Sequence, residues 1–211
     1  MSEESRVFVI DDDADMRLSL QWLLESAGLR VWLFDSAEAF LAADVHRQPG
    51  CLLLDVRMPG MGGIRLLEQL GRMGCRLPVI MFTGHGDIAM AVQTMKAGAF
   101  DFLEKPASHQ LIIGRVQEAL EKDRLQRSRQ QDLSDMEQRL QQLTPREREI
   151  LERLTEGLST REISACFGIS ERTVEKHRER LIQKLNARSV VDVVRRVLEH
   201  RNGAEASPTA P

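Results

Sequence analysis

The sequence has few cysteines, no long apolar run and no glycine-rich phosphate loop, and each absence narrows its class. Its three cysteines, Cys51, Cys75 and Cys166, are far apart and form no CxxC pair. Neither a disulfide framework nor a cysteine zinc site is therefore predicted, and each cysteine is expected to be a small buried apolar residue. No apolar run approaches the roughly 18 residues that a membrane span needs. The GxxxxGK[ST] motif is missing, which argues against an ATPase-type activator.

The start of the chain and its composition also lack the marks of an exported or a disordered protein. "MSEES" is acidic and has neither the basic nor the apolar region of a signal peptide, so we expect a cytoplasmic protein. Of the 211 residues, 42% are hydrophobic and 29% are charged, which is typical of a globular chain. This length suits two domains of roughly 60–130 residues each.

Charge is distributed unevenly along the chain. Residues 143–203 carry 13 Lys and Arg against 10 Asp and Glu, whereas the rest of the chain carries 16 against 22. The net charge of −3 therefore hides an acidic front and a mildly basic back. This asymmetry indicates different partners for the two parts.

The first part of the chain alternates short apolar runs with helical patterns. The runs are "RVFVI", "LRVWLF", "GCLLLD", "LPVIMF" and "AFDFL". Continuous apolar runs of this length are typical of parallel strands that are covered on both faces. Five βα units within about 120 residues predict an α/β domain with a doubly wound, five-stranded parallel sheet.

Two helix boundaries can be predicted within this part. Gly28 stands where a helix would stop, and apolar residues precede it at helical spacing: Leu20, Leu23, Leu24 and Ala27. Asp35 and Glu38 have the spacing of a capping box, which predicts that the next helix begins there.

Strand character disappears after about Ile113. Residues 123–142 are rich in Gln, Arg, Asp and Glu without Pro or Gly, which predicts a polar helical linker. Along its second half and at the residue that follows it, a short a/d stripe has 3-4-3 spacing: Leu133, Met136, Leu140 and Leu143. Two heptads are too few to predict a coiled coil, so a dimerising zipper remains an alternative. Residues 204–211 are mostly small and include two prolines, and we expect them to be disordered.

Residues 143–203 are predicted to form an all-α domain of four short helices that share one core. "TPRE" and "STRE" have the pattern of capping boxes, with the pairs Thr144–Glu147 and Ser159–Glu162. Two further serines can cap helices, and two glycines stand where helices would stop: Ser170 and Ser189, and Gly157 and Gly168.

Polar residues follow four of the apolar runs. Asp11 and Asp12 end the first expected strand in "VFVIDDDAD", Asp55 ends the third, Thr83 the fourth and Lys105 the fifth. Because chemistry in a doubly wound sheet sits at the carboxyl ends of the strands, we expect these side chains to lie together. A lone "DDD" would otherwise indicate a solvated loop.

Such an acidic cluster is unfavourable unless a cation neutralises it, and Mg²⁺ suits a site of few carboxylates. One carboxylate could then attack phosphorus and form an aspartyl phosphate. Lys105 would supply a positive charge to the phosphoryl oxygens, and Thr83 a hydroxyl donor. Asp13 is expected to be a solvated rim residue, and Asp15 to stand at a helix start.

This constellation resembles the receiver domain of bacterial response regulators, over about residues 5–122 of a domain that we place at 1–122. The resemblance implies the strand order 2-1-3-4-5 and Asp55 as the phosphoacceptor. It implies a Mg²⁺ site made by Asp12, Asp55, Asp11 (largely through water) and the backbone carbonyl of Arg57. It also implies Thr83 and Phe102 as switch residues, Lys105 as the phosphate-binding lysine and a cis Lys105–Pro106 bond.

"STREISACFGISERTVEKHRERLIQKL" has the layout of a helix-turn-helix. A capped helix ends at Gly168, and a second helix begins at Ser170 and turns three apolar residues to the core: Val174, Leu181 and Leu185. Its remaining surface carries basic residues, namely Arg172, Lys176, Arg178, Arg180 and Lys184. Such a helix can enter the major groove of DNA, although a solvated face of an ordinary bundle is the alternative.

The run from "LTPRE" to "NARS" resembles the LuxR-type DNA-binding domain. With "TGHGD" and "TMKAGAFDFLEKP" of the first part, the chain resembles a FixJ-type response regulator of the NarL/FixJ family. The resemblance implies DNA contacts by one set of residues: Glu175, Lys176 and Glu179 at bases, Thr173, His177 and Lys184 at phosphates, and also Arg180. The family often has Lys at position 175; a glutamate there can accept from a cytosine amino group but repels phosphate. His177 could equally be a packed residue.

Together these features predict a two-component transcription factor rather than an enzyme. A sensor histidine kinase would phosphorylate Asp55, the surface from about residue 87 to 120 would change, and a homodimer would bind a double-stranded DNA operator. One alternative is a magnesium-dependent phosphatase with Asp11 as the nucleophile in "DDDAD". Another is a regulator controlled by a dissociable metabolite, for which the sequence indicates no large apolar pocket.

Overall fold

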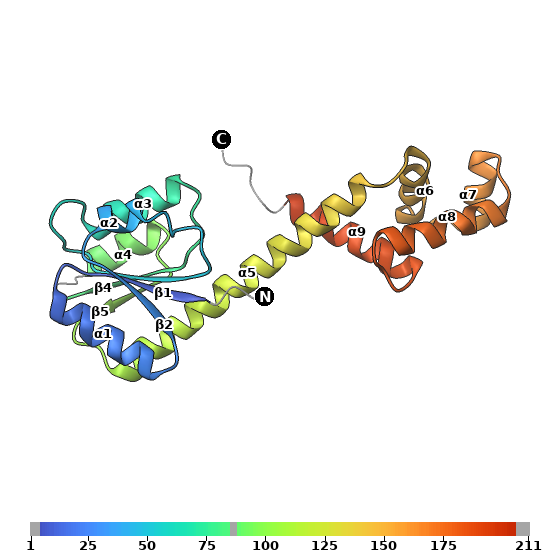
Figure 1. The fold of residues 1–211 in the computed structure, drawn as a ribbon. Coiled ribbons are helices and arrows are strands. Elements are labelled where there is room, and N and C mark those ends of the chain that lie inside the picture. The colour runs from blue at the N-terminus through green and yellow to red at the C-terminus, as the bar shows by residue number, and fades with distance from the viewer. Residues whose placement is uncertain (1–4, 85–87, 206–211) are drawn as a thin grey trace. The chain divides into compact units, whose positions relative to one another are not determined.

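The computed structural model of the protein describes residues 5–84 and 88–205. The chain divides into two compact units, one that ends at Arg127 and one that begins at Ser128. The first unit is α/β and the second is helical, as the sequence predicts (Figure 1). Residues 206–211 of the expected tail lie outside the described residues. So does position 87, the start of the surface at about 87–120 that is expected to change on phosphorylation.

Five parallel strands form the centre of the first unit: β1 (Arg6–Ile10), β2 (Arg30–Phe34), β3 (Gly50–Leu54), β4 (Val79–Thr83) and β5 (Asp101–Glu104). Their order is β2-β1-β3-β4-β5, which confirms the predicted fold. In the register of β1 with β3, Ile10 pairs with Leu54. The residues that follow these strands, Asp11 and Asp55, therefore leave the sheet side by side.

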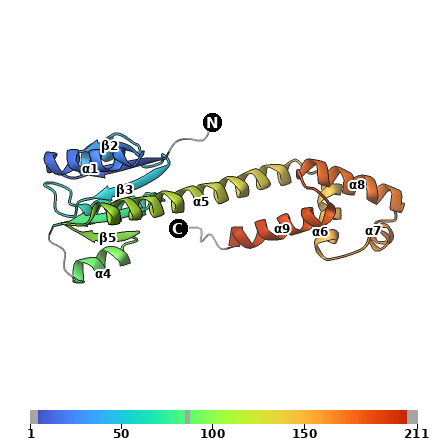
Figure 2. The same ribbon diagram turned by 90° about the horizontal axis from the view of Figure 1, so that it is seen from below.

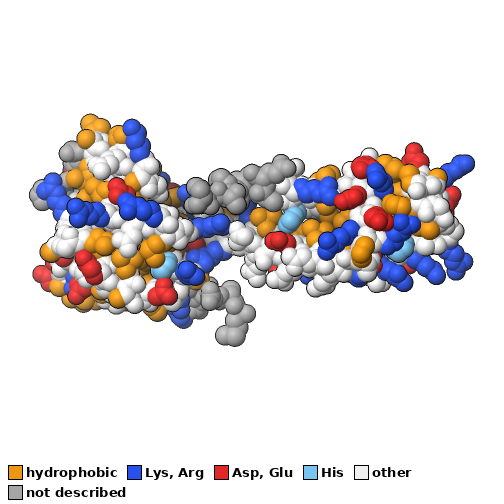
Figure 3. All heavy atoms as spheres, turned by 90° about the horizontal axis from the view of Figure 1, so that it is seen from above, with side chains coloured by type: hydrophobic (Ala, Val, Ile, Leu, Met, Phe, Trp, Pro, Cys, Tyr) orange, Lys and Arg blue, Asp and Glu red, His pale blue; other side chains and the backbone are white. Residues whose placement is uncertain are grey.

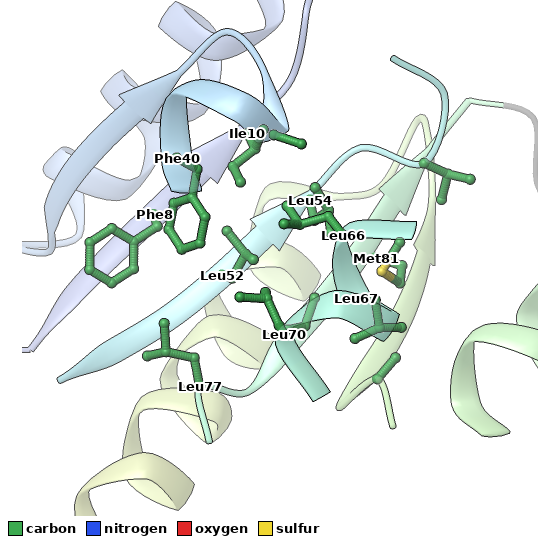
Figure 4. Packing of buried hydrophobic residues seen from close by; sticks show 14 of the residues in the cluster. Phe8, Ile10, Phe40, Leu52, Leu54, Leu66, Leu67, Leu70, Leu77 and Met81 are labelled. Carbon is green, nitrogen blue, oxygen red and sulfur yellow. The ribbon is translucent and has the colours of Figure 1, made fainter. Parts of the chain in front are cut away.

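Helices cover both faces of this sheet: α1 (Ala14–Ser26), α2 (Ala37–Ala42), α3 (Gly63–Arg72), α4 (Ile88–Lys96) and α5 (His109–Gln141). Helices α2, α3 and α4 lie on one face, and α1 and the start of α5 on the other (Figure 1). Alternating residues of β1 supply both cores. Phe8 and Ile10 pack with Phe40 on one face (Figure 4), and Val7 and Val9 pack with Leu24 on the other.

The caps of α1 and α2 differ from the sequence predictions. Asp13 is exposed, as expected, but it is also the N-cap of α1, and its carboxylate accepts from the backbone N–H of Asp15 and of Met16. The predicted capping box of Asp35 and Glu38 is wrong. Ser36 caps α2, one position later, because its hydroxyl accepts from the backbone N–H of Ala39.

Helix α5 is one continuous helix of 33 residues, and its first turns lie along the sheet of the first unit (Figure 2). The expected linker begins at Asp123, yet this residue is only 1% exposed. Its carboxylate accepts from the Gly50 N–H at 2.9 Å and from Arg127 Nε at 2.8 Å. Arg127 also donates to the carbonyls of Arg47 and Gln48. These bonds fasten residues 123–127 to the segment that leads into β3.

The second unit contains α6 (Pro145–Thr155), α7 (Thr160–Phe167), α8 (Glu171–Lys184) and α9 (Val190–Glu205). Both predicted capping boxes are confirmed, at Thr144 with Glu147 and at Ser159 with Glu162. Ser170 caps α8, as predicted. In the same way, Gly168 ends α7 in the left-handed conformation, at φ 63°.

The end of α5 packs into the core of this helical unit. Met136 and Leu143 are buried in the apolar cluster that includes Ile150 and Val197, and Leu140 packs against it. Three of the four residues of the a/d stripe, Met136, Leu140 and Leu143, are therefore part of the core of the second unit.

The cysteines lie in three different environments. Cys51 is buried, as expected, and Cys75 is half-buried. Cys166 is exposed, so the expectation of burial is wrong for it. Its neighbours on α7, Ile163 and Phe167, take the positions that face the core. Among the described residues, every helix is too short or too polar to span a membrane.

Candidate phosphoacceptor site and DNA-binding helix

Three strands bring two carboxylates and a lysine together at the carboxyl edge of the sheet. Asp11 follows β1, Asp55 follows β3 and Lys105 follows β5. The ammonium of Lys105 donates to Asp11 Oδ2 at 2.6 Å and to Asp55 Oδ1 at 2.8 Å. These side chains therefore meet at the carboxyl ends of the strands, as the sequence predicts. Lys105 is 94 positions from Asp11 and 50 positions from Asp55 in the sequence.

The trio is largely shielded from water. Asp11 is 2% exposed and Asp55 is 7% exposed. Burial raises the pKa of Asp11, and its hydrogen bond to Lys105 offsets part of that rise. Burial alone would lower the pKa of Lys105, but hydrogen bonds to both carboxylates outweigh it and hold the pKa of Lys105 above its usual value. The lysine is therefore a permanent positive charge beside Asp55.

The backbone around Asp55 fixes its carboxylate. Oδ2 accepts from the Arg57 N–H at 2.7 Å, while Oδ1 faces Lys105. The Asp55 N–H donates to the Ile10 carbonyl at 2.8 Å. Gly63 approaches from α3 so closely that a Cβ there would lie 2.1 Å from the Asp55 carbonyl oxygen. Glycine is therefore required at this position for steric reasons.

Asp12 is not part of this buried trio. It is exposed, and no group of three or more His, Cys, Asp or Glu side chains in the described ranges is gathered closely enough to hold a metal ion. The structure therefore brings together two of the three expected carboxylates and leaves the third at the rim. The chemistry of the set still suits Mg²⁺, since it offers carboxylate and backbone carbonyl oxygens and no nitrogen or sulfur.

Of the two expected switch residues, Thr83 contacts a member of the trio, and Phe102 lies on the strand that leads to Lys105. Thr83, the last residue of β4, is 1% exposed, and its carbonyl accepts from the Lys105 N–H at 2.8 Å. Phe102 lies on β5, half-buried against the apolar cluster on the α3 side of the sheet. The Lys105–Pro106 peptide bond is cis, as the resemblance implied.

Two supporting contacts were not foreseen from the sequence. Glu38 on α2 accepts from the Met61 N–H at 2.9 Å and so holds the loop that follows Asp55. Arg17 on α1 donates to the backbone carbonyl of Asp11 at 2.6 Å. Glu38 and Met61 are 23 positions apart, and no local sequence signal links them.

In the second unit, α7 and α8 form the predicted helix-turn-helix. Val174, Leu181 and Leu185 are fully buried. Most of the residues expected at DNA are exposed on the other side of α8: Lys176, Glu179 and Arg180, together with Glu175. On the face drawn in Figure 3, basic side chains of this unit are interspersed with acidic ones, so charge does not mark a DNA surface on that face.

The residues expected to contact phosphates on α8, Lys184, Thr173 and His177, already have partners or are partly covered. The Lys184 ammonium lies 2.6 Å from the buried Glu147 carboxylate and also meets the Gln142 carbonyl. The Thr173 hydroxyl lies 2.9 Å from that of Ser170. His177 is half-buried, and burial, with Arg180 nearby, lowers its pKa. This environment favours the packed interpretation of His177.

The comparisons with known proteins match both units. The response regulator receiver domain family matches residues 7–117, and the luxR family of bacterial regulatory proteins matches residues 141–197. The transcriptional regulatory protein FixJ of Azorhizobium caulinodans is 44% identical over 198 residues, which cover 94% of both chains. The chain belongs to the FixJ-type response regulators.

Other known proteins are similar to this chain over nearly its whole length. The transcriptional regulatory protein TdiR of Thauera aromatica is 42% identical over 92% of this chain and 86% of its own. The solved structure of the response regulator StyR has a TM-score of 0.84 at 41% identity, over 93% of this chain and 99% of that one. Full-length FixJ from B. japonicum has a TM-score of 0.59 at 39% identity, with 95% and 99% coverage.

Membership of the FixJ-type response regulators fixes the kind of activity. The protein is a two-component response regulator and transcription factor with a receiver domain and a LuxR-type DNA-binding domain. It is not an enzyme of the phosphatase class, so that alternative for the acidic stretch is wrong. A receiver domain implies a histidine kinase as a partner, and the second domain implies DNA.

Proposed function

We propose that Asp55 is the phosphoacceptor of this response regulator. The observation that carries the proposal is the 2.8 Å contact between Asp55 Oδ1 and the Lys105 ammonium, within a nearly buried site at the strand ends. In the phosphoryl transfer, a carboxylate oxygen of Asp55 attacks the phosphorus of a phosphohistidine on the partner kinase. The P–N bond breaks, and the imidazole keeps the electron pair and takes up a proton.

The neighbours of Asp55 have separate tasks in this transfer. Lys105 already holds Asp11 and Asp55, and we propose that it also binds the phosphoryl oxygens as they arrive. Thr83 would donate its hydroxyl to another of these oxygens. Receiver domains generally bind Mg²⁺ at acidic residues. Here Asp12, Asp11 and Asp55, with the Arg57 carbonyl, would hold it, and it would supply positive charge to the phosphoryl oxygens.

The proposed output is a homodimer that binds a DNA operator. When Thr83 and Phe102 shift, the surface of α4, β5 and α5 changes, and two receivers pair through it. Two copies of α8 then enter the major groove at two half-sites. We propose base contacts by Glu175, Lys176 and Glu179, and phosphate contacts by Thr173 and Arg180, with Lys184 and His177 having mainly structural roles.

We also propose how the chain divides into domains and in which cellular compartment it acts. We place the receiver at residues 1–122, a helical linker at 123–142 and the DNA-binding domain at 143–203. Since the proposed ligand is the operator DNA, the proposed compartment is the cytoplasm.

Covalent labelling of the full-length chain tests the first step. Acetyl phosphate with Mg²⁺ should phosphorylate the wild type, and peptide mapping should place the phosphoryl group on Asp55. Asp55→Asn should remain unlabelled, whereas Asp35→Asn, which changes an exposed carboxylate after β2, should be labelled normally. Labelling of Asp55→Asn at the wild-type rate, or a label on Asp11, would overturn the assignment.

A further inference from the structure

Three side chains connect the start of α7 to the middle of α8. The Thr160 hydroxyl donates to Glu175 Oε1 at 2.7 Å. Arg178 Nη1 donates to the same carboxylate oxygen at 3.1 Å and also to the Thr160 hydroxyl oxygen. Thr160 is the first residue of α7, and Glu175 and Arg178 are one turn apart on α8. We call this set the Thr160–Glu175–Arg178 network.

The network leaves one carboxylate oxygen of Glu175 available. Oε1 is the acceptor in both of its hydrogen bonds, and within the described residues Oε2 has no hydrogen-bond partner. The Glu175 side chain is 53% exposed, whereas that of Arg178 is 27% exposed. Glu175 is therefore held through Oε1 by an arginine and a hydroxyl, while its half-exposed side chain keeps a second oxygen that can still accept a hydrogen bond.

This arrangement changes what a glutamate can do near DNA. A free glutamate is repelled by phosphates and loses rotamer freedom when it binds. In the network, the Arg178 guanidinium neutralises the charge and the side chain is already fixed. The remaining oxygen can only accept a hydrogen bond, so it fits the amino group of cytosine or adenine and not the acceptor atoms of guanine or thymine in the major groove.

We propose that Arg178 and Thr160 are positioning residues that hold Glu175 to read a base amino group. This inference rests on the proposed function, in which the N-terminal half of α8 lies in the major groove. Arg178 and Thr160 thereby decide the sequence preference at one base pair of each half-site. A merely structural role, in which they tie α7 to α8, would instead change the affinity for all sequences alike.

The test uses the full-length protein, phosphorylated with acetyl phosphate, and a pool of DNA with a randomised half-site. Sequencing of the bound DNA gives the preference of the wild type at each position. Binding isotherms on the selected site and on copies with one changed base pair then give affinity ratios. The variants are Glu175→Ala, Arg178→Met and Thr160→Val. Because valine is nearly isosteric with threonine, Thr160→Val still tests the network if Arg178→Met does not fold.

The matched control is Arg153→Met on α6, because Arg153 and Glu156 form an Arg–Glu pair at the same i,i+3 spacing. The affinity ratio is the affinity for the selected site divided by the affinity for a copy with one changed base pair. At the base pair where Glu175→Ala lowers this ratio, Arg178→Met and Thr160→Val should also lower it by roughly 10-fold or more. Arg153→Met should keep the wild-type ratio. Wild-type ratios in both folded network variants, or equal losses on all sequences, would overturn the proposal. Failure of the wild type to select any sequence would instead overturn the proposed DNA-binding function.

Discussion

The ammonium of Lys105 lies 2.8 Å from the Asp55 carboxylate, and the same ammonium lies 2.6 Å from Asp11. One lysine therefore compensates two nearly buried carboxylates from different strands. Because these bonds hold the pKa of Lys105 above its usual value, this compensation persists at neutral pH. Lys105 therefore offsets the cost of burying the Asp55 carboxylate, the group that we propose attacks phosphorus.

Removing the lysine should slow phosphorylation. In Lys105→Met, two carboxylates remain without their cation, and the phosphoryl group loses a donor, so labelling by acetyl phosphate should fall about 100-fold. Intact-mass spectrometry over time measures the rate. Lys96→Met, which removes an exposed lysine from α4, should be labelled like the wild type. Equal rates for the two variants would contradict the role given to Lys105.

Two glycines of α3 should respond oppositely to alanine. Gly63→Ala places a Cβ 2.1 Å from the Asp55 carbonyl oxygen, so it should destabilise the first unit by about 1–3 kcal/mol and slow labelling of Asp55. Gly71 has no heavy atom within 4 Å of an added Cβ, and Gly71→Ala should stabilise the helix by about 0.5–1 kcal/mol. Denaturant unfolding followed by tryptophan fluorescence reports this unit, since Trp22 and Trp32 both lie in it. A normal labelling rate in Gly63→Ala would argue against the tight approach at Asp55.

The Glu147–Lys184 pair should make the second unit sensitive to acid. Burial alone raises the pKa of Glu147, but hydrogen bonds from Lys184 and Thr144 outweigh it and hold the pKa of Glu147 below its ordinary value of 4.5. The unfolded chain therefore takes up the proton first. The stabilisation is fully present above pH 4.5 and is lost as the pH falls through the lower pKa of the folded state.

Glu147→Gln tests this pair while it keeps an acceptor for the Thr144 N–H. At pH 7 it should cost about 1–3 kcal/mol, because the half-buried Lys184 ammonium loses its counter-charge, and it should remove much of the acid sensitivity. Thermal unfolding followed by far-UV circular dichroism, with tryptophan fluorescence to mark the first unit, gives both quantities. Glu149→Gln, in an exposed pair with Arg146, should cost less than about 0.5 kcal/mol. Equal costs for these two variants would count against the pair.

Lys176 is expected to contribute directly to DNA binding. It is exposed in the first half of α8. Lys176→Ala should weaken binding to a selected operator by roughly 1–3 kcal/mol, since a base contact is lost. Arg201→Ala removes an equal charge from the exposed end of α9 and should leave operator affinity within about two-fold. Electrophoretic mobility shifts at fixed salt measure both, and unchanged affinity in Lys176→Ala would rule it out as a base reader.

The fold and the main site were predictable because their signals are local or follow from topology. Apolar runs identify strands, and parallel strands place Asp11, Asp55 and Lys105 at one edge. Capping boxes such as that of Thr144 and Glu147 lie within four consecutive residues.

Contacts between distant segments were not predictable in the same way. Nothing in the sequence near Asp123 indicates that it binds the Gly50 N–H, or that Lys184 pairs with Glu147 rather than facing outward. The choice of Ser36 over Asp35 as the cap of α2 has no clear signal in the sequence, because both residue types cap helices and the two stand side by side before the helix. The position of Asp12 directly after Asp11 likewise does not reveal that Asp12 is exposed while Asp11 is buried.

The central claim is that phosphorylation of Asp55 controls DNA binding. The most direct measurement is the operator affinity of the full-length protein before and after treatment with acetyl phosphate, for the wild type and for Asp55→Asn. We predict that treatment raises the affinity of the wild type about 10-fold or more and leaves Asp55→Asn unchanged. An equal gain in affinity in both proteins would contradict the account.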